Sequence, residues 1–263
     1  MVRGTLNGAS FVPRNVRTSA GVSVPPFTIF IPAYNAEHTL EAVIERIPGE
    51  LWEPLCTLFV INDGSADDTS GTVRRIAARH PKVVLCEQTV NQGYGTSVRR
   101  GLRQSLETPA EYVVCLHADG QYPPEKLPEF LPYMKEHGVD VLQGSRHKLG
   151  TARAGGMPRY KVLAGHMLTW MENKTFGLRM TDYHSGFMLY SRRAVEQIPF
   201  DSLSYYFDFD LEVIADARAR GLVVDELGIP THYGDEESHL NPILYGLRCL
   251  RVMLRYKLGR YGR

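Results

Sequence analysis

The chain has 263 residues, of which 43% are hydrophobic and 22% charged, so it is long enough for one large domain with its own core. No run of 18 or more apolar residues occurs, and residues 1–26 lack the apolar segment of a signal peptide, which excludes both a bilayer-spanning helix and a secretion signal. The sequence therefore predicts a cytoplasmic protein.

The net charge of +1 is unevenly distributed. Residues 1–26 and 238–263 carry nine basic residues and no acidic ones, which leaves 21 basic and 29 acidic residues in between, a net charge of −8. An acidic body favours carboxylates gathered at a site, and a basic end favours contact with anions. No basic stripe with interleaved aromatic residues crosses the body, so a nucleic-acid binder is excluded.

The N-terminal half alternates short apolar runs with amphipathic segments after residues 1–26, which we interpret as a flexible N-terminal tail. Such alternation predicts an α/β fold, in which helices cover both faces of a mostly parallel, Rossmann-like sheet. The predicted strands are Phe27–Pro32, Leu55–Asn62, Val83–Glu87, Tyr112–His117 and Val139–Gly144. The predicted helices are Glu37–Ile47, Asp67–His80, Thr96–Glu107 and Pro124–His137.

The second half is less regular. It begins with a basic, glycine-rich loop at 148–156. The elements predicted after it are a helix Val162–Phe176, a strand Gly186–Tyr190, a helix Asp210–Arg220, a strand Val223–Leu227 and a C-terminal amphipathic helix Asn241–Leu258. We therefore assign residues 27–237 to one domain and 238–263 to a basic amphipathic helix.

The four cysteines form no C-x-x-C pair. Three lie in short apolar runs and one in a helical pattern, which favours buried free thiols over disulfides or a zinc site. They are Cys56, Cys86, Cys115 and Cys249.

The strongest local signal is the segment from Cys115 to Pro124, where an apolar strand ends in polar residues. His117, Asp119 and Gln121 recur at every second position, so in an extended chain all three would project from one face. A carboxylate and an amide oxygen at this spacing suit a hard divalent cation, Mg²⁺ or Mn²⁺, that holds a diphosphate. A polar strand end followed by a Pro-Pro turn is the alternative.

Three further segments occur in order with that one: Ile29 to Asn35, Val60 to Thr69, and Asn91 to Gly101. Together the four resemble family 2 glycosyltransferases, most closely the catalytic domains of dolichyl- or polyprenyl-phosphate sugar (mannose) synthases. The resemblance covers Phe27 to Tyr233. It implies the glycosyltransferase A-type fold and a catalytic domain over 27–237.

The resemblance also implies residue roles on the donor side. Residues expected to bind the nucleotide sugar are Pro32, Ala33, Tyr34, Asn35, Asp63, Gly93, Arg99, His117 and Ala118. Asp119 matches the metal-binding aspartate, and Gln121 and His232 are further candidate metal ligands. His117 stands where these enzymes usually have an aspartate, and Ala36 where they often have a glutamate.

On the acceptor side, the segment Thr181 to Tyr190 resembles the D-x-x-S-G-F element of the family. Residues implied to bind the acceptor are Arg146, Arg159, Asp182 and Ser185. A guanidinium group binds a phosphate in a bidentate manner, which fits a lipid phosphate.

Phe207 to Glu212 falls where related enzymes place their catalytic carboxylate. Asp208 or Asp210 is the candidate general base for a hydroxyl acceptor, whereas a phosphate acceptor needs none. Asp210 could equally cap the following helix, and both interpretations stay open.

The resemblance thus implies an inverting, metal-dependent transfer of a hexose from a GDP- or UDP-sugar to a polyprenyl phosphate or a hydroxyl. A non-catalytic sugar-nucleotide-binding or membrane-docking scaffold of the same fold is the alternative.

In the C-terminal helix, Ile243, Leu247, Leu250 and Leu254 share one face, and Arg248, Arg251 and Arg255 share another. Such a helix either lies at a membrane surface, as a peripheral contact, or packs on the domain with its basic face in water.

Overall fold

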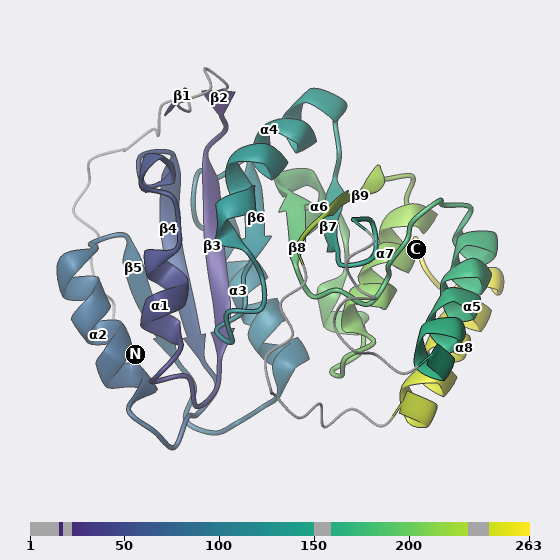
Figure 1. Ribbon diagram of the computed structural model, residues 1–263, viewed down its shortest axis with the longest axis horizontal. Coiled ribbons are helices and arrows are strands. Elements are labelled where there is room, and N and C mark those ends of the chain that lie inside the picture. The colour runs from purple at the N-terminus through teal and green to yellow at the C-terminus, as the bar shows by residue number, and fades with distance from the viewer. Residues whose placement is uncertain (1–15, 18–22, 150–158, 231–241) are drawn as a thin grey trace.

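The computed structural model describes residues 16–17, 23–149, 159–230 and 242–263 (Figure 1). Within these ranges, a seven-stranded sheet forms the centre of the molecule, in the order β5-β4-β3-β6-β8-β7-β9. Its strands are β3 (Phe27–Ala33), β4 (Leu55–Asn62), β5 (Val83–Glu87), β6 (Tyr112–Cys115), β7 (Val141–Ser145), β8 (Met188–Ser191) and β9 (Val224–Gly228).

All but one of these strands run in the same direction. β8 is antiparallel to both of its neighbours, β6 and β7, while the remaining pairs are parallel. The predicted mostly parallel α/β fold is confirmed. The inner strands, from β4 to β7 in the sheet order, are mostly buried on both faces, which explains their continuous apolar runs, whereas the edge strands β5 and β9 are partly exposed.

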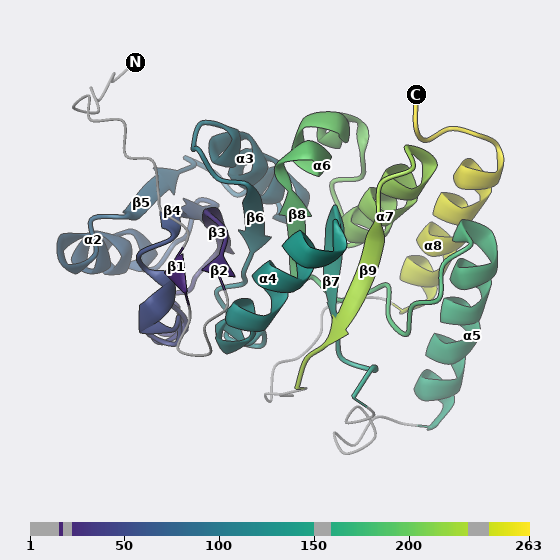
Figure 2. The same cartoon turned by 90° about the horizontal axis from the view of Figure 1, so that it is seen from above.

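Helices cover both faces of the sheet (Figure 2). On one face lie α1 (Leu40–Glu45), α2 (Thr69–Arg79) and α4 (Leu127–His137), and on the other α3 (Tyr94–Leu106), α6 (Arg192–Gln197) and α7 (Phe209–Ala219). Each face has its own cluster of buried side chains. Short 3₁₀ turns occur at Gly49–Leu51, Pro124–Lys126 and Phe200–Ser202.

Two long helices lie beside α7 at the β9 end of the sheet. These are α5 (Arg159–Phe176) and α8 (Pro242–Lys257), which pack against each other (Figure 1). Cys249 and Val252 of α8 belong to the same buried cluster as α7. The C-terminal helix is therefore part of the domain core rather than a separate unit.

Residues 23–26 depart from the predicted flexible tail. Ser23–Val24 forms strand β2, which pairs with β1 (Val16–Arg17), and Val24 is only 1% exposed. The carbonyl oxygen of Pro26 accepts hydrogen bonds from the backbone N–H groups of Glu111 and Tyr112. The folded part of the chain thus begins before residue 27.

The segment after β6 also differs from expectation. The strand ends at Cys115 and the chain turns at 118–120, where Gly120 has a φ of +76°. The prediction that His117, Asp119 and Gln121 project from one face of an extended chain is therefore wrong. A residue with a positive φ interrupts the extended backbone, so side chains at every second position no longer share a face.

None of the helices in the described ranges combines the length and the apolar character that crossing a lipid bilayer requires.

Candidate active site

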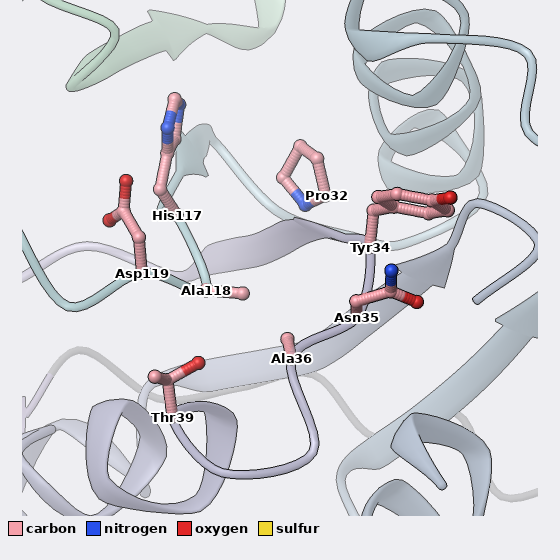
Figure 3. A pocket seen from close by; sticks show the side chains of 8 residues that line it. All are labelled: Pro32, Tyr34, Asn35, Ala36, Thr39, His117, Ala118 and Asp119. Carbon is pink, nitrogen blue, oxygen red and sulfur yellow. The ribbon is translucent and has the colours of Figure 1, made fainter. Parts of the chain in front are cut away.

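A polar pocket of about 280 Å³ opens where β3 and the segment after β6 end (Figure 3). His117 and Asp119 lie on one side of it and Tyr34 and Asn35 on the other. In sheets of this kind, ligands bind outside the carboxyl ends of the strands. The pocket is lined by Pro32, Tyr34, Asn35, Ala36, Thr39, His117, Ala118 and Asp119. Of the predicted donor-side residues, Pro32, Tyr34, Asn35, His117, Ala118 and Asp119 are thus brought together, and buried Ala33 ends β3 beside them.

The turn after β3 is held by the turn after β4. The Asn35 N–H donates to Ser65 Oγ at 2.9 Å, and the Ala66 N–H donates to Asn35 Oδ1 at 2.9 Å. Asn35 has a φ of +50°, a region that asparagine tolerates better than other non-glycine residues. These bonds leave the Tyr34 ring 51% exposed at the pocket, where a base or ribose could stack on it.

Asp63 is buried and organises the segment that follows β5. Its Oδ1 accepts from the Gln92 N–H at 2.8 Å and from Gln88 Nε2 at 2.9 Å, and its Oδ2 accepts from the Gly93 N–H at 2.8 Å. Gly93 has a φ of +87°, which a side chain would strain. Contact between Asp63 and a nucleotide base stays a prediction.

Arg99, which was expected to bind the nucleotide sugar, does not line the polar pocket. Its guanidinium is buried and donates to the carbonyl oxygens of Phe200, Leu203 and Ser204. It also lies 3.8 Å from the centre of the Tyr205 ring. Arg99 therefore anchors the loop before α7 instead of facing a nucleotide.

Asp119 exposes its carboxylate in the polar pocket, with Oδ1 accepting from the Gln121 N–H at 3.0 Å. The Gln121 side-chain oxygen accepts from Arg146 Nη2 at 3.1 Å, and the Arg146 guanidinium lies 4.9 Å from the centre of the Tyr122 ring. Because a carboxylate oxygen suits Mg²⁺ or Mn²⁺, Asp119 fits a metal, whereas Gln121 would first have to release Arg146. His232 lies outside the described residues.

A second pocket, of about 300 Å³, adjoins the first and shares His117 with it. Burial lowers the pKa of the His117 imidazole, although Asp119 acts in the opposite direction. The second pocket is lined by Tyr94, His117, Tyr122, His184, Gly186, Phe207, Asp210 and Tyr245.

Asp210 is the carboxylate of this second pocket. It lies in the first turn of α7 rather than at the N-cap, and Tyr94 Oη donates to its Oδ2 at 3.2 Å. Its Oδ1 is buried with no hydrogen-bond partner among the described residues. Burial raises the pKa of Asp210 to about 7. The group can therefore accept a proton near neutral pH, as a general base must.

Asp208 occupies the N-cap position of α7 and does not line the pocket. Its Oδ1 accepts from Ser204 Oγ at 2.7 Å and lies 3.2 Å from Arg248 Nη1. The Asp208 carboxylate ties the loop to α8 in this geometry, and its role as an alternative base stays a prediction.

Asp182 and Ser185 lie behind the second pocket rather than in its lining. Asp182 Oδ1 accepts from the His184 N–H at 2.9 Å, and its Oδ2 accepts from the Arg146 N–H at 3.3 Å. Ser185 is fully buried, and its carbonyl oxygen accepts from Gln143 Nε2. The two residues hold the loop that presents His184 and Gly186. Arg159 begins α5, but its side chain is outside the described part.

Sequence reasoning missed the aromatic lining of the second pocket. Four of its residues lie within or beside the sequence motifs, and their position there was the only local signal that they could line a site. They are Tyr94, Tyr122, His184 and Phe207. Tyr245 comes from α8, far along the chain, and no motif marks it.

The model of the family "Glycosyl transferase family 2" matches residues 28–199. The undecaprenyl-phosphate mannosyltransferase of Micrococcus luteus is 28% identical over 246 residues, which cover 87% of this chain and 97% of that protein.

Two solved structures share the fold. Glucosyl-3-phosphoglycerate synthase of Mycobacterium tuberculosis, in complex with UDP, superposes with a TM-score of 0.63 at 19% identity, over 93% of this chain and 83% of that one. The mannosyltransferase PcManGT of Pyrobaculum calidifontis, in complex with GDP-Man and Mn²⁺, superposes with a TM-score of 0.62 at 18% identity, over 91% and 66%. The predicted glycosyltransferase A-type fold is confirmed.

Proposed function

The chain belongs to glycosyltransferase family 2, and on that premise we propose that it transfers a hexose from a nucleoside-diphosphate sugar to a polyprenyl phosphate, with inversion at the anomeric carbon. The observation that carries this proposal is the pair of adjoining pockets that share His117. A sugar held at His117 would have its diphosphate in the polar pocket and its acceptor in the other. Attack from the acceptor side opposes the leaving group, which gives inversion.

The donor side would act through the polar pocket. Tyr34 offers an exposed ring to the nucleoside, and the Asp119 carboxylate, with His117 beside it, fits Mg²⁺ or Mn²⁺. When bound, such a cation neutralises charge on the departing diphosphate as a Lewis acid. Binding of this metal is also in keeping with PcManGT, whose complex contains GDP-Man and Mn²⁺.

Arg146 supports an anionic acceptor. Its guanidinium lies against Tyr122, which lines the second pocket, and it binds Gln121 next to the donor side. An acceptor phosphate could replace Gln121 on this guanidinium, because Arg binds phosphate through two parallel N–H groups. The polyprenyl class is supported by the mannosyltransferase of M. luteus, which is named for undecaprenyl phosphate.

The outer face of α8 supports a lipid-borne acceptor. Leu247, Leu250 and Leu254 are 59%, 43% and 60% exposed, while Tyr245 on the same helix lines the second pocket. The outer leucines would enter a lipid surface, and exposed Arg251 would meet anionic headgroups. Arg248 and Arg255 are instead paired with the α7 carboxylates of Asp208 and Glu212, so the predicted basic face is partly turned inward.

A hydroxyl acceptor is the second candidate, and Asp210 favours it. A hydroxyl must lose a proton to attack, and this buried carboxylate, with a pKa near 7, is placed to take that proton. A phosphate acceptor arrives ionised and needs no base.

The variant Asp210→Asn separates the two acceptors. For a hydroxyl, kcat should fall by about 100- to 10,000-fold, the usual range for a lost general base, whereas for a polyprenyl phosphate it should change only a few-fold. The assay supplies GDP- or UDP-hexose with Mn²⁺ and either undecaprenyl phosphate in detergent or a panel of sugar alcohols and glycosides. Absence of transfer to every acceptor, with donor still bound, would support the non-catalytic scaffold and overturn the proposal.

A further inference from the structure

Three potential metal ligands meet at the wall of the second pocket, which His184 lines. Glu172 comes from α5, His184 from the loop before β8, and Cys249 from α8. One ligand atom from each lies within 4.8 Å of the other two. Glu172 and Cys249 are fully buried, and the His184 side chain is 23% exposed.

Glu172 and His184 approach each other as an ion pair, but no hydrogen bond satisfies the facing atoms of this pair among the described residues. Both carboxylate oxygens of Glu172 and Nε2 of His184 are buried without a hydrogen-bond partner among the described residues. Glu172 Oε2 and His184 Nε2 are 3.4 Å apart, the separation of an ion pair when His184 is protonated. A buried carboxylate in this condition is costly unless a cation compensates it.

We propose that Glu172, His184 and Cys249 bind one Zn²⁺ ion through a carboxylate oxygen, Nε2 and the thiolate sulfur. Cys249 loses its proton to solvent on binding. The carboxylate, the thiolate, the neutral imidazole and the divalent ion then sum to zero charge, which suits a buried site.

The geometry of the cluster agrees with this assignment. Two nitrogen or oxygen ligands of a tetrahedral zinc ion lie about 3.3 Å apart, close to the separation of Oε2 and Nε2. The Nδ1 of His184 is 2.8 Å from the hydroxyl of Tyr245, a contact that orients the ring and leaves Nε2 for the metal. The thiolate selects a soft cation, so this site is distinct from one for Mg²⁺ or Mn²⁺ at Asp119.

The bound ion would join three segments of the chain: α5, α8 and the loop before β8. It would tie α5 and α8 to the loop that carries His184 and so hold one wall of the second pocket, where His184 and Tyr245 are lining residues. The ion takes no part in the transfer step proposed above.

Metal analysis of the full chain, purified without chelator and washed with Mg²⁺ buffer, tests the proposal. We expect about one zinc ion per chain in the wild type and in Asp119→Ala, and none in Cys249→Ser. Cys86→Ser is the matched control, because Cys86 is also a buried free thiol but lies on β5, and it should retain the metal.

Cobalt substitution of the wild type supplies a second measurement, which does not depend on the folding of any variant. Co²⁺ added to the metal-free wild type should give thiolate-to-cobalt charge-transfer absorption in the near ultraviolet. Glu172→Gln, which preserves side-chain shape, should weaken Co²⁺ binding at least tenfold. If the wild type retains no zinc and gives no thiolate band with Co²⁺, the cluster is a buried Glu172–His184 ion pair and the proposal is overturned.

Discussion

The two pockets are assembled in different ways. The polar pocket takes its lining from two short segments, 32–39 and 117–119, whereas the second pocket draws on residues from α3, the segment after β6, two loops, α7 and α8. The first is held by loop-to-loop hydrogen bonds at the strand ends, and the second by packing of aromatic rings around a buried carboxylate. The lining of the polar pocket can thus be recognised from contiguous motifs, while the lining of the second pocket forms only where distant segments meet.

The largest expected effect is on the donor side. Asp119→Ala should lower kcat by about 1,000-fold or more, because a metal that stabilises leaving-group charge contributes several kcal/mol. It should also abolish the Mn²⁺ dependence of donor binding in calorimetry, with unchanged circular dichroism.

Asp201→Ala is the control for that variant. Asp201 is an exposed aspartate that pairs with Arg103 away from both pockets, and its loss should leave turnover unchanged. Normal turnover of Asp119→Ala in the presence of EDTA would show that the polar pocket does not work through a metal.

Burial of Asp210 in the second pocket should make the free energy of unfolding depend on pH. The pKa of Asp210 is about 7 in the folded protein against 3.8 ordinarily, so the folded state holds a proton that the unfolded state has released between these values. The wild type should therefore lose stability as pH rises from 4 through 7. Asp210→Asn should be more stable than the wild type at pH 8, by at most about 4 kcal/mol, and the difference should vanish near pH 4.

Urea unfolding at pH 4, 6 and 8 measures this difference. Donor binding by Asp210→Asn should remain at the wild-type level, because Asp210 lines the second pocket and not the polar pocket. Equal stability of the two proteins at all three pH values would mean that Asp210 is not desolvated in solution.

The smallest effect concerns the surface beyond the second pocket. Leu250→Ser combined with Leu254→Ser should weaken binding to vesicles of anionic lipid by about tenfold, because each leucine loses part of its 1.5–3 kcal/mol of burial. The two leucines are exposed, so thermal stability should not change.

Flotation with vesicles that contain 30% anionic lipid, compared with neutral vesicles, makes the measurement. Val90→Ser changes an equally exposed apolar residue away from α8 and should bind like the wild type. If the double variant floats with the vesicles as the wild type does, the proposal that α8 contacts the membrane is contradicted.

Local pattern determined most of the elements. The strands Leu55–Asn62 and Val83–Glu87 were predicted with their observed bounds, because buried parallel strands appear as continuous apolar runs. The motifs at Pro32–Asn35 and His117–Asp119 meet at the polar pocket, at the carboxyl ends of parallel strands, and the donor-binding role that the family resemblance implies for them stays a prediction.

Only the tertiary structure decided which distant segments contact one another. It placed β8 antiparallel in the sheet, turned Arg99 inward onto a loop, separated buried Asp210 from ion-paired Asp208, and brought Cys249 to Glu172 and His184. Periodicity shows which face of an element is apolar, but not which other element covers it. The burial, ion pairing and pKa of a side chain depend on which element packs over it. The chemistry of the second pocket was therefore decided by tertiary packing.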